Sequence, residues 1–181
     1  MYTYPHTIQN KHGEKLSFVR LIQEADGDKL ETEGWVKPGA GPIMHVHWKQ
    51  DESLTVVKGK MGIEVPGKEI QYFGPGETAT FIRGSWHRFW NAGEEELQIK
   101  GWIKPAHNIV YFLSGIYQAL DEGKNNRPEP IRASFLFTKY KSEFGAGGIP
   151  VFVKKVIIPM QYFIGKISGA HKKFKDAPDA I

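Results

Sequence analysis

The chain has 181 residues, of which 40% are hydrophobic and 13% aromatic, and this composition excludes a largely disordered protein. It has no cysteine, which excludes disulfides and thiolate metal sites and leaves histidine and carboxylate as the strong metal ligands. Its net charge of +4 comes from the part after Lys104, which has 11 basic and 6 acidic residues. The part up to Lys104 has 13 basic and 14 acidic residues. The length suits one domain with a real core, or a domain with an appendage.

The beginning of the chain, MYTYPHTIQNKHGEK, has no basic segment followed by an apolar run, so we expect no secretory signal. No uninterrupted apolar stretch approaches the roughly 20 residues that a membrane-spanning helix needs. Together with the absence of cysteine, these features predict a soluble, cytoplasmic protein.

Short runs rich in Val, Ile, Thr and aromatic residues, divided by Gly, Pro and Asp clusters, fill the chain up to Ile103. Regular short runs of this kind are typical of an all-β sandwich or barrel. The clearest strand candidates are residues 16–22, 30–36, 54–57, 61–65, 78–82 and 97–103.

The hydrophobic period becomes helical after Pro105, so we place one boundary at Lys104-Pro105. This predicts a β-barrel over residues 1–104 and a helical extension over residues 105–181, packed on the barrel or on a partner. Within the extension we expect a helix over 109–120 that stops near Gly123, a second helix over 133–144, and a third over 150–167 with a bend at Pro159.

The stretch from Gly39 to Gly59 contains the most informative polar residues of the strand-rich part. His45 and His47 are separated by one residue, and alternate side chains of a strand point to the same face, so both imidazoles can reach one metal ion. Glu52, at the start of the next strand candidate, could add a carboxylate ligand.

A second stretch, GETATFIRGSWHRFWN, begins at Gly76 and contains His87 in an aromatic run. Both stretches resemble the two sequence motifs of the cupin superfamily in spacing and order. Residues Gly39, His45, His47, Glu52 and Gly59 reproduce the first motif, and residues Gly76, Gly84, His87 and Asn91 reproduce the second, with Ile82 where the pattern usually has proline. That departure affects a turn and not a ligand.

The resemblance covers about the first hundred residues and implies a double-sheet jelly-roll barrel. It further implies that His45, His47, Glu52 and His87 converge inside the barrel on one divalent metal. Three imidazoles and one carboxylate suit Fe, Mn, Ni, Co, Cu or Zn, and the ligands alone do not choose among them. In a six-coordinate arrangement two positions would remain for substrate, or for substrate and dioxygen.

Strand alternation also predicts which side chains line a substrate pocket beside the metal. They are Leu54, Val56, Met61, Ile63 and Phe89. An apolar pocket favours an aromatic, ring-containing or aliphatic small molecule over a polyanion. We therefore expect a metal-binding cupin that acts on a small organic molecule, as a dioxygenase or isomerase. The alternative is a non-catalytic module that binds a small ligand or a metal, because the fold alone does not determine function.

The segment from Pro150 to Gly169 has a wide apolar face that we expect to be buried against the barrel, the other helices or a partner subunit. A helix lying on a membrane surface is the rarer outcome, although its basic flanks would suit anionic lipid. The basic residues form no continuous stripe and no helix-turn-helix pattern is present, so we expect no nucleic-acid partner. An exposed sheet edge predicts a homodimer, which is common in the family that the chain resembles.

Overall fold

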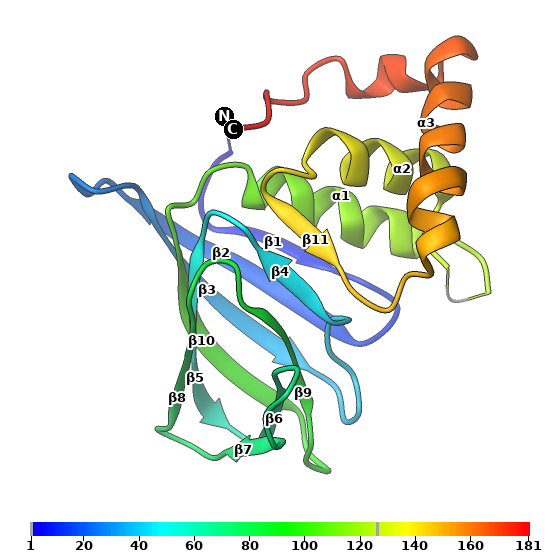
Figure 1. Ribbon diagram of the computed structural model, residues 1–181. Coiled ribbons are helices and arrows are strands. Elements are labelled where there is room, and N and C mark those ends of the chain that lie inside the picture. The colour runs from blue at the N-terminus through cyan, green and yellow to red at the C-terminus, as the bar shows by residue number, and fades with distance from the viewer. Residues whose placement is uncertain (1, 126) are drawn as a thin grey trace.

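Two antiparallel sheets face each other in the computed structural model, which describes residues 2–125 and 127–181 (Figure 1). The six-stranded sheet has the order β1 (His6–Gln9), β2 (Glu14–Ile22), β3 (Lys29–Val36), β10 (Leu97–Lys104), β5 (Asp51–Lys58) and β8 (Thr78–Phe81). The five-stranded sheet has the order β11 (Phe144–Ala146), β4 (His45–His47), β9 (Trp86–Asn91), β6 (Met61–Glu64) and β7 (Gln71–Phe73).

The strands form because apolar side chains alternate with polar ones and fill the space between the sheets. In β3, for example, Leu30, Thr32 and Val36 are buried, whereas Glu33 is exposed. The barrel core consists of Val36, Leu54, Val56, Met61, Ile63, Ala79, Phe81, Leu97 and Ile99. The predicted fold class, a mainly β jelly-roll barrel with C-terminal helices, is confirmed.

Two helices cover one end of this barrel (Figure 1). They are α1 (Ile109–Glu122) and α2 (Pro130–Lys139), and α2 begins where the Glu129 carboxylate accepts hydrogen bonds from the backbone N–H groups of Ile131 and Arg132. A second core fills the space between these helices and the neighbouring part of the barrel. It contains Phe18, Leu30, Ile103, Ala106, Ile109, Val110, Phe112, Phe135, Leu136, Tyr140, Phe144 and Phe174.

The predicted second helix, 133–144, was wrong at its C-terminal end. The helix ends at Lys139, and after a turn the chain forms β11, which pairs antiparallel with β4. The edge of β4 is otherwise open, and pairing satisfies its backbone hydrogen-bonding groups. Gly145 allows the close approach, because a Cβ at this position would lie 2.7 Å from Cγ1 of Val46. The helical part of the chain therefore contributes one strand to the barrel.

The third helical segment begins after Pro150 and contains a π-helical turn, Val153–Ile157, followed by α3 (Ile158–Ile167) and a 3₁₀ turn, Ala170–Phe174. The wider π turn precedes Pro159, where we expected a bend. Such a turn accommodates a proline whose ring would otherwise crowd the carbonyl group of the preceding turn.

Candidate metal centre

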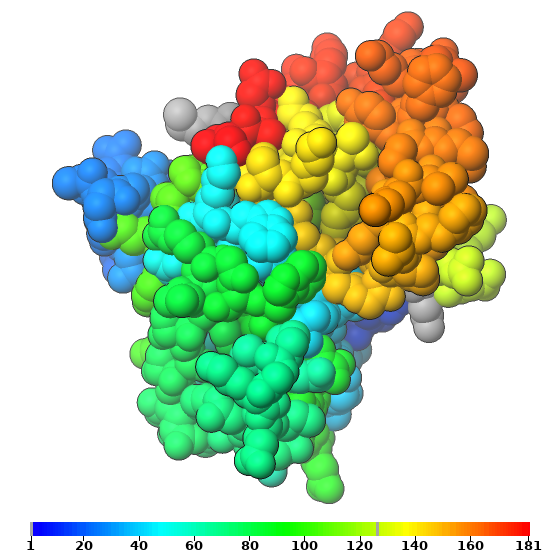
Figure 2. All heavy atoms as spheres, viewed as in Figure 1, coloured from blue at the N-terminus to red at the C-terminus, as the bar shows by residue number. Residues whose placement is uncertain are grey.

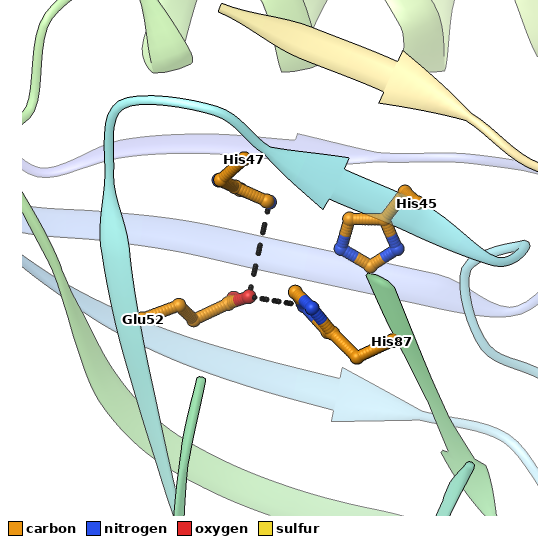
Figure 3. A group of neighbouring side chains, drawn as sticks. All are labelled: His45, His47, Glu52 and His87. Carbon is orange, nitrogen blue, oxygen red and sulfur yellow. Dashed lines mark hydrogen bonds and ion pairs between the residues drawn. The ribbon is translucent and has the colours of Figure 1, made fainter. Parts of the chain in front are cut away.

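Three strands bring together the four predicted ligands (Figure 3). In β4, His45 and His47 point to the same side, and the buried Val46 between them points to the other. The backbone register of β4 and β9 places His45 opposite His87, and Glu52 projects from the start of β5. One ligand atom from each of these residues lies within 4.8 Å of those from the other three.

The orientation of His87 creates a position for a cation between two lone pairs, one on its own ring and one on the carboxylate of Glu52. Its Nδ1 lies 2.9 Å from the carbonyl oxygen of Ser85, which only accepts hydrogen bonds, so this nitrogen carries the hydrogen of the neutral ring. The unprotonated Nε2 then faces Oε2 of Glu52 at 3.0 Å. Two lone pairs at this distance repel each other unless a cation, either a proton or a metal ion, lies with them.

A hydrogen bond from Nδ1 to a backbone carbonyl group also orients His45. Its Nδ1 lies 2.8 Å from the carbonyl oxygen of Ile43, so its Nε2 is available as a ligand atom. His47 differs, because its Nδ1 is buried without a hydrogen-bond partner and its Nε2 lies 3.8 Å from Oε2 of Glu52. Because Nε2 is the nitrogen that faces Glu52, it is the atom that His47 would offer to a metal ion.

The pKa shifts at the cluster favour the protonation states that bind metals. Burial, together with the neighbouring His87 and His47, lowers the pKa of His45 to about 3, and burial also lowers the pKa of His47. Burial alone would raise the pKa of Glu52, but when a proton is the cation on Nε2 of His87, its hydrogen bond to Glu52 and the charge of the surrounding histidines outweigh burial and hold the pKa at about 2. At neutral pH the site therefore offers the neutral imidazoles of His45 and His47 beside an ionised Glu52 carboxylate.

Aromatic rings hold two of the imidazoles in place. Phe81 stacks on His87 with ring centroids 3.9 Å apart, and Phe144 of β11 meets His47 edge-on at 5.7 Å. The carbonyl group of Glu143 accepts a hydrogen bond from the backbone N–H of Trp48, directly after His47. The C-terminal part of the chain therefore supports a strand that carries two of the ligands.

The donor set and its spacing fit one transition-metal ion. Nitrogen and oxygen atoms about 2.1 Å from a common ion lie roughly 3 to 4 Å from one another. Nε2 of His87 and Nε2 of His47 lie 3.0 Å and 3.8 Å from Oε2 of Glu52, and all four ligand atoms lie within 4.8 Å of one another. Three imidazoles and a carboxylate suit several divalent metals, so the geometry does not select one.

A cavity of about 80 Å³ lies beside the four ligands, and His45, His47 and Glu52 form part of its wall. Of the five predicted pocket residues, Leu54 and Phe89 line it. Val56, Met61 and Ile63 instead pack into the barrel core. The other apolar lining side chains are Leu16, Val36, Ile99, Ile103 and Leu113. A larger hollow of about 440 Å³ lies between Tyr2, His107 and Asp176. We place the functional site in the smaller cavity because three of the four ligands line it, whereas none lines the larger hollow.

Sequence reasoning missed a polar pair in the wall of this cavity. Tyr117 of α1 donates a hydrogen bond of 3.1 Å to Oε2 of Glu14 in β2, and both residues line the cavity. Burial raises the pKa of Glu14 and raises the pKa of Tyr117 well above its ordinary value. The sequence contained one sign of this pair, the hydroxyl group of Tyr117 on the otherwise apolar inner face of α1. Hydrophobic periodicity alone predicts that such a residue packs in the core.

The comparison with protein families agrees with this geometry. A family described as "Cupin domain" matches residues 35–103, the segment that carries all four ligands. Residues 35–103 of the chain therefore match a cupin domain, in agreement with the fold. A solved structure from Klebsiella pneumoniae, described as an uncharacterized conserved protein with a double-stranded beta-helix domain, matches at 20% identity and a TM-score of 0.42, over 48% of this chain and 70% of that one.

Two curated proteins are similar to this chain in sequence. The "Probable oxidoreductase virH" of Hypocrea virens is 36% identical over 73 residues, or 39% of this chain and 33% of that protein. The "Oxidoreductase iacF" of Pestalotiopsis fici is 28% identical over 112 residues, or 56% of this chain and 54% of that protein. The matched regions thus span a third and about half of the lengths of these relatives.

Proposed function

We propose that this cupin is a metal-dependent oxidoreductase of the dioxygenase type that acts on a small, mostly apolar organic molecule. The observation that carries the proposal is the pair of electron-rich atoms, Nε2 of His87 and Oε2 of Glu52, held 3.0 Å apart beside an apolar cavity. The names of the two fungal relatives support the redox class.

His45, His47, Glu52 and His87 would hold the metal. When bound, a divalent transition metal supplies Lewis acidity, and it supplies redox chemistry as well if it is iron, manganese or copper. The aliphatic and aromatic wall excludes water and favours a substrate without several charges.

Tyr117 and Glu14 are the polar groups that would orient a substrate in this wall. The hydroxyl group of Tyr117 can turn from Glu14 to an oxygen atom of the substrate, and the raised pKa of Glu14 makes its carboxyl group more easily protonated. A proton donor and acceptor facing the substrate would also suit an isomerase, and this pair is the observation that favours that second function.

The test compares turnover with metal content in three purified proteins. We expect metal-stripped wild-type protein reloaded with Fe(II) to consume dioxygen with at least one member of a panel of small cyclic and aliphatic molecules that carry one or two oxygen atoms. His47→Ala should lose both metal and turnover. His107→Asn is the matched control, because His107 is exposed, lies outside the cluster and has a positive φ of 43° that asparagine tolerates.

Two results would contradict the proposal in different ways. Stoichiometric metal without dependent turnover, whether of dioxygen or of isomerised product, would favour a non-catalytic binding module. Turnover that survives His47→Ala would remove the assigned site from the reaction.

A further inference from the structure

The positive charge of the chain is concentrated in one segment, residues 144–175. This segment of 32 residues contains six of the 24 basic residues and none of the 20 acidic ones, so the rest of the chain has a small negative charge. The six are Lys154, Lys155, Lys166, Lys172, Lys173 and Lys175, and all are exposed. Of these, Lys173 lies 3.9 Å from the carboxylate of Glu129.

The helix in this segment packs on the protein through its least apolar side. Gly165 is the buried residue of α3, and a Cβ there would lie 2.2 Å from Nε2 of His171, so the helix rests closely on the turn that follows it. Half-buried Tyr162 stacks on Phe135 of α2 with ring centroids 6.3 Å apart. The face opposite Gly165 is therefore turned away from the protein.

That outward face is apolar. Its most exposed members are Ile167 at 67%, Phe152 at 64% and Phe163 at 60%. The complete set, which we call the α3 stripe, is Phe152, Val156, Met160, Phe163, Ile164 and Ile167. These positions recur every three or four residues and so form one continuous strip along the helix. Figure 2 shows the segment, in orange, as a ridge at the edge of the molecule.

The predicted burial of this face against the barrel or the other helices was wrong, since all six side chains of the α3 stripe are exposed. Its burial against a partner subunit stays a prediction. Contiguous apolar surface of this kind commonly marks a site of interaction with a protein or a membrane. Lys155 and Lys166 lie along one edge of the stripe at helical spacing. Lys154 lies on the side of Gly165, with its ammonium group 5.7 Å from the ring of Trp86.

We propose that the α3 stripe and its lysines bind the surface of an anionic lipid bilayer. The apolar side chains would enter the boundary between headgroups and acyl chains, and the lysines would contact the anionic headgroups. The 17 helical residues from Val151 to Ile167 measure about 25 Å, and among the described residues no helix is long and apolar enough to cross a membrane, so the helix would lie in the plane of the interface.

Charge favours lipid over a second copy of the chain. Two α3 stripes in contact would bring the lysines of both copies together, and the segment has no carboxylate to pair with them. An anionic bilayer satisfies the apolar side chains and the lysines at the same time.

The experiment is sedimentation of the full chain with vesicles of phosphatidylcholine alone or mixed with phosphatidylserine. We expect wild-type protein to sediment with the mixed vesicles and to remain in the supernatant with the neutral ones. Because each lysine near an anionic surface contributes about fivefold to binding, Lys155→Gln/Lys166→Gln should weaken binding about 25-fold. Phe152→Ser/Phe163→Ser/Ile167→Ser should abolish it.

The matched control is Val57→Ser/Ile70→Ser/Ile82→Ser, which replaces three exposed apolar side chains outside α3 and should leave binding unchanged. Wild-type protein that stays in the supernatant with both vesicle types, or α3 variants that bind as wild-type does, would overturn the proposal. If light scattering shows a dimer that the α3 serine variant dissociates, and wild-type protein does not bind vesicles, the stripe is an interface between two copies instead.

Discussion

Replacing Phe144 tests whether the C-terminal part of the chain supports the metal centre. The Phe144 ring is buried, stacks on Phe112 with centroids 4.2 Å apart and contacts His47 edge-on. Phe144→Ala should cost about 3–5 kcal/mol of unfolding free energy, as is usual for a buried phenylalanine. It should also weaken metal binding about 10- to 100-fold, the usual effect of losing a contact that orients a ligand.

Phe135→Ala is the matched control for this prediction. Phe135 is buried in the same core and stacks on Phe174 at 4.3 Å, and among the described residues its ring partners are Tyr162, His171 and Phe174, none of which is a ligand. Urea unfolding should show similar losses for both variants, and competition with a chromophoric chelator for Co(II) should show weaker binding for Phe144→Ala alone. Equal metal affinities in the two variants would refute the idea that β11 positions His47.

Two further predictions concern the polar pair in the cavity wall. Burial raises the pKa of Glu14 in the folded state above 4.5, so its contribution to stability is complete below that pH and is lost as the pH rises through the raised pKa. Glu14→Gln should therefore raise the urea midpoint at pH 7, with the difference fading below pH 4.5; an unchanged difference across that range would contradict the shift. Tyr117→Phe removes a hydrogen bond that stabilises the carboxylate, so it should raise the pKa of Glu14 further, as measured by carbon NMR of the side-chain carboxyl group. A lower pKa in the variant would show that Tyr117 does not donate to Glu14.

The sequence predicted the barrel well because strand alternation and turn residues are local signals. The predicted strand 97–103 corresponds to β10, Leu97–Lys104, and the predicted strand 30–36 corresponds to β3, Lys29–Val36. It could not predict β11, whose three residues, Phe144 to Ala146, have no period of their own and form a strand because the edge of β4 lies beside them. Tertiary pairing, and not local propensity, determines that strand.

The same distinction applies to the candidate site. The spacing of the ligands and the cupin motifs predicted which four residues meet. The facing lone pairs of His87 and Glu52 depend on the hydrogen bond from His87 to the carbonyl group of Ser85, which the spacing does not predict. The period of the third helix predicted its apolar face. What that face contacts depends on which side of α3 packs on the protein, and there Gly165 is the buried residue.

The most direct test of the central claim is elemental analysis of the purified protein combined with an anomalous-scattering map of its crystals. We predict about one transition-metal ion per chain and one strong peak between the three imidazoles and the carboxylate of Glu52, as their donor set requires. Metal-soaked crystals without a peak there, or stoichiometric metal bound elsewhere, would contradict the assignment of His45, His47, Glu52 and His87 as a metal centre.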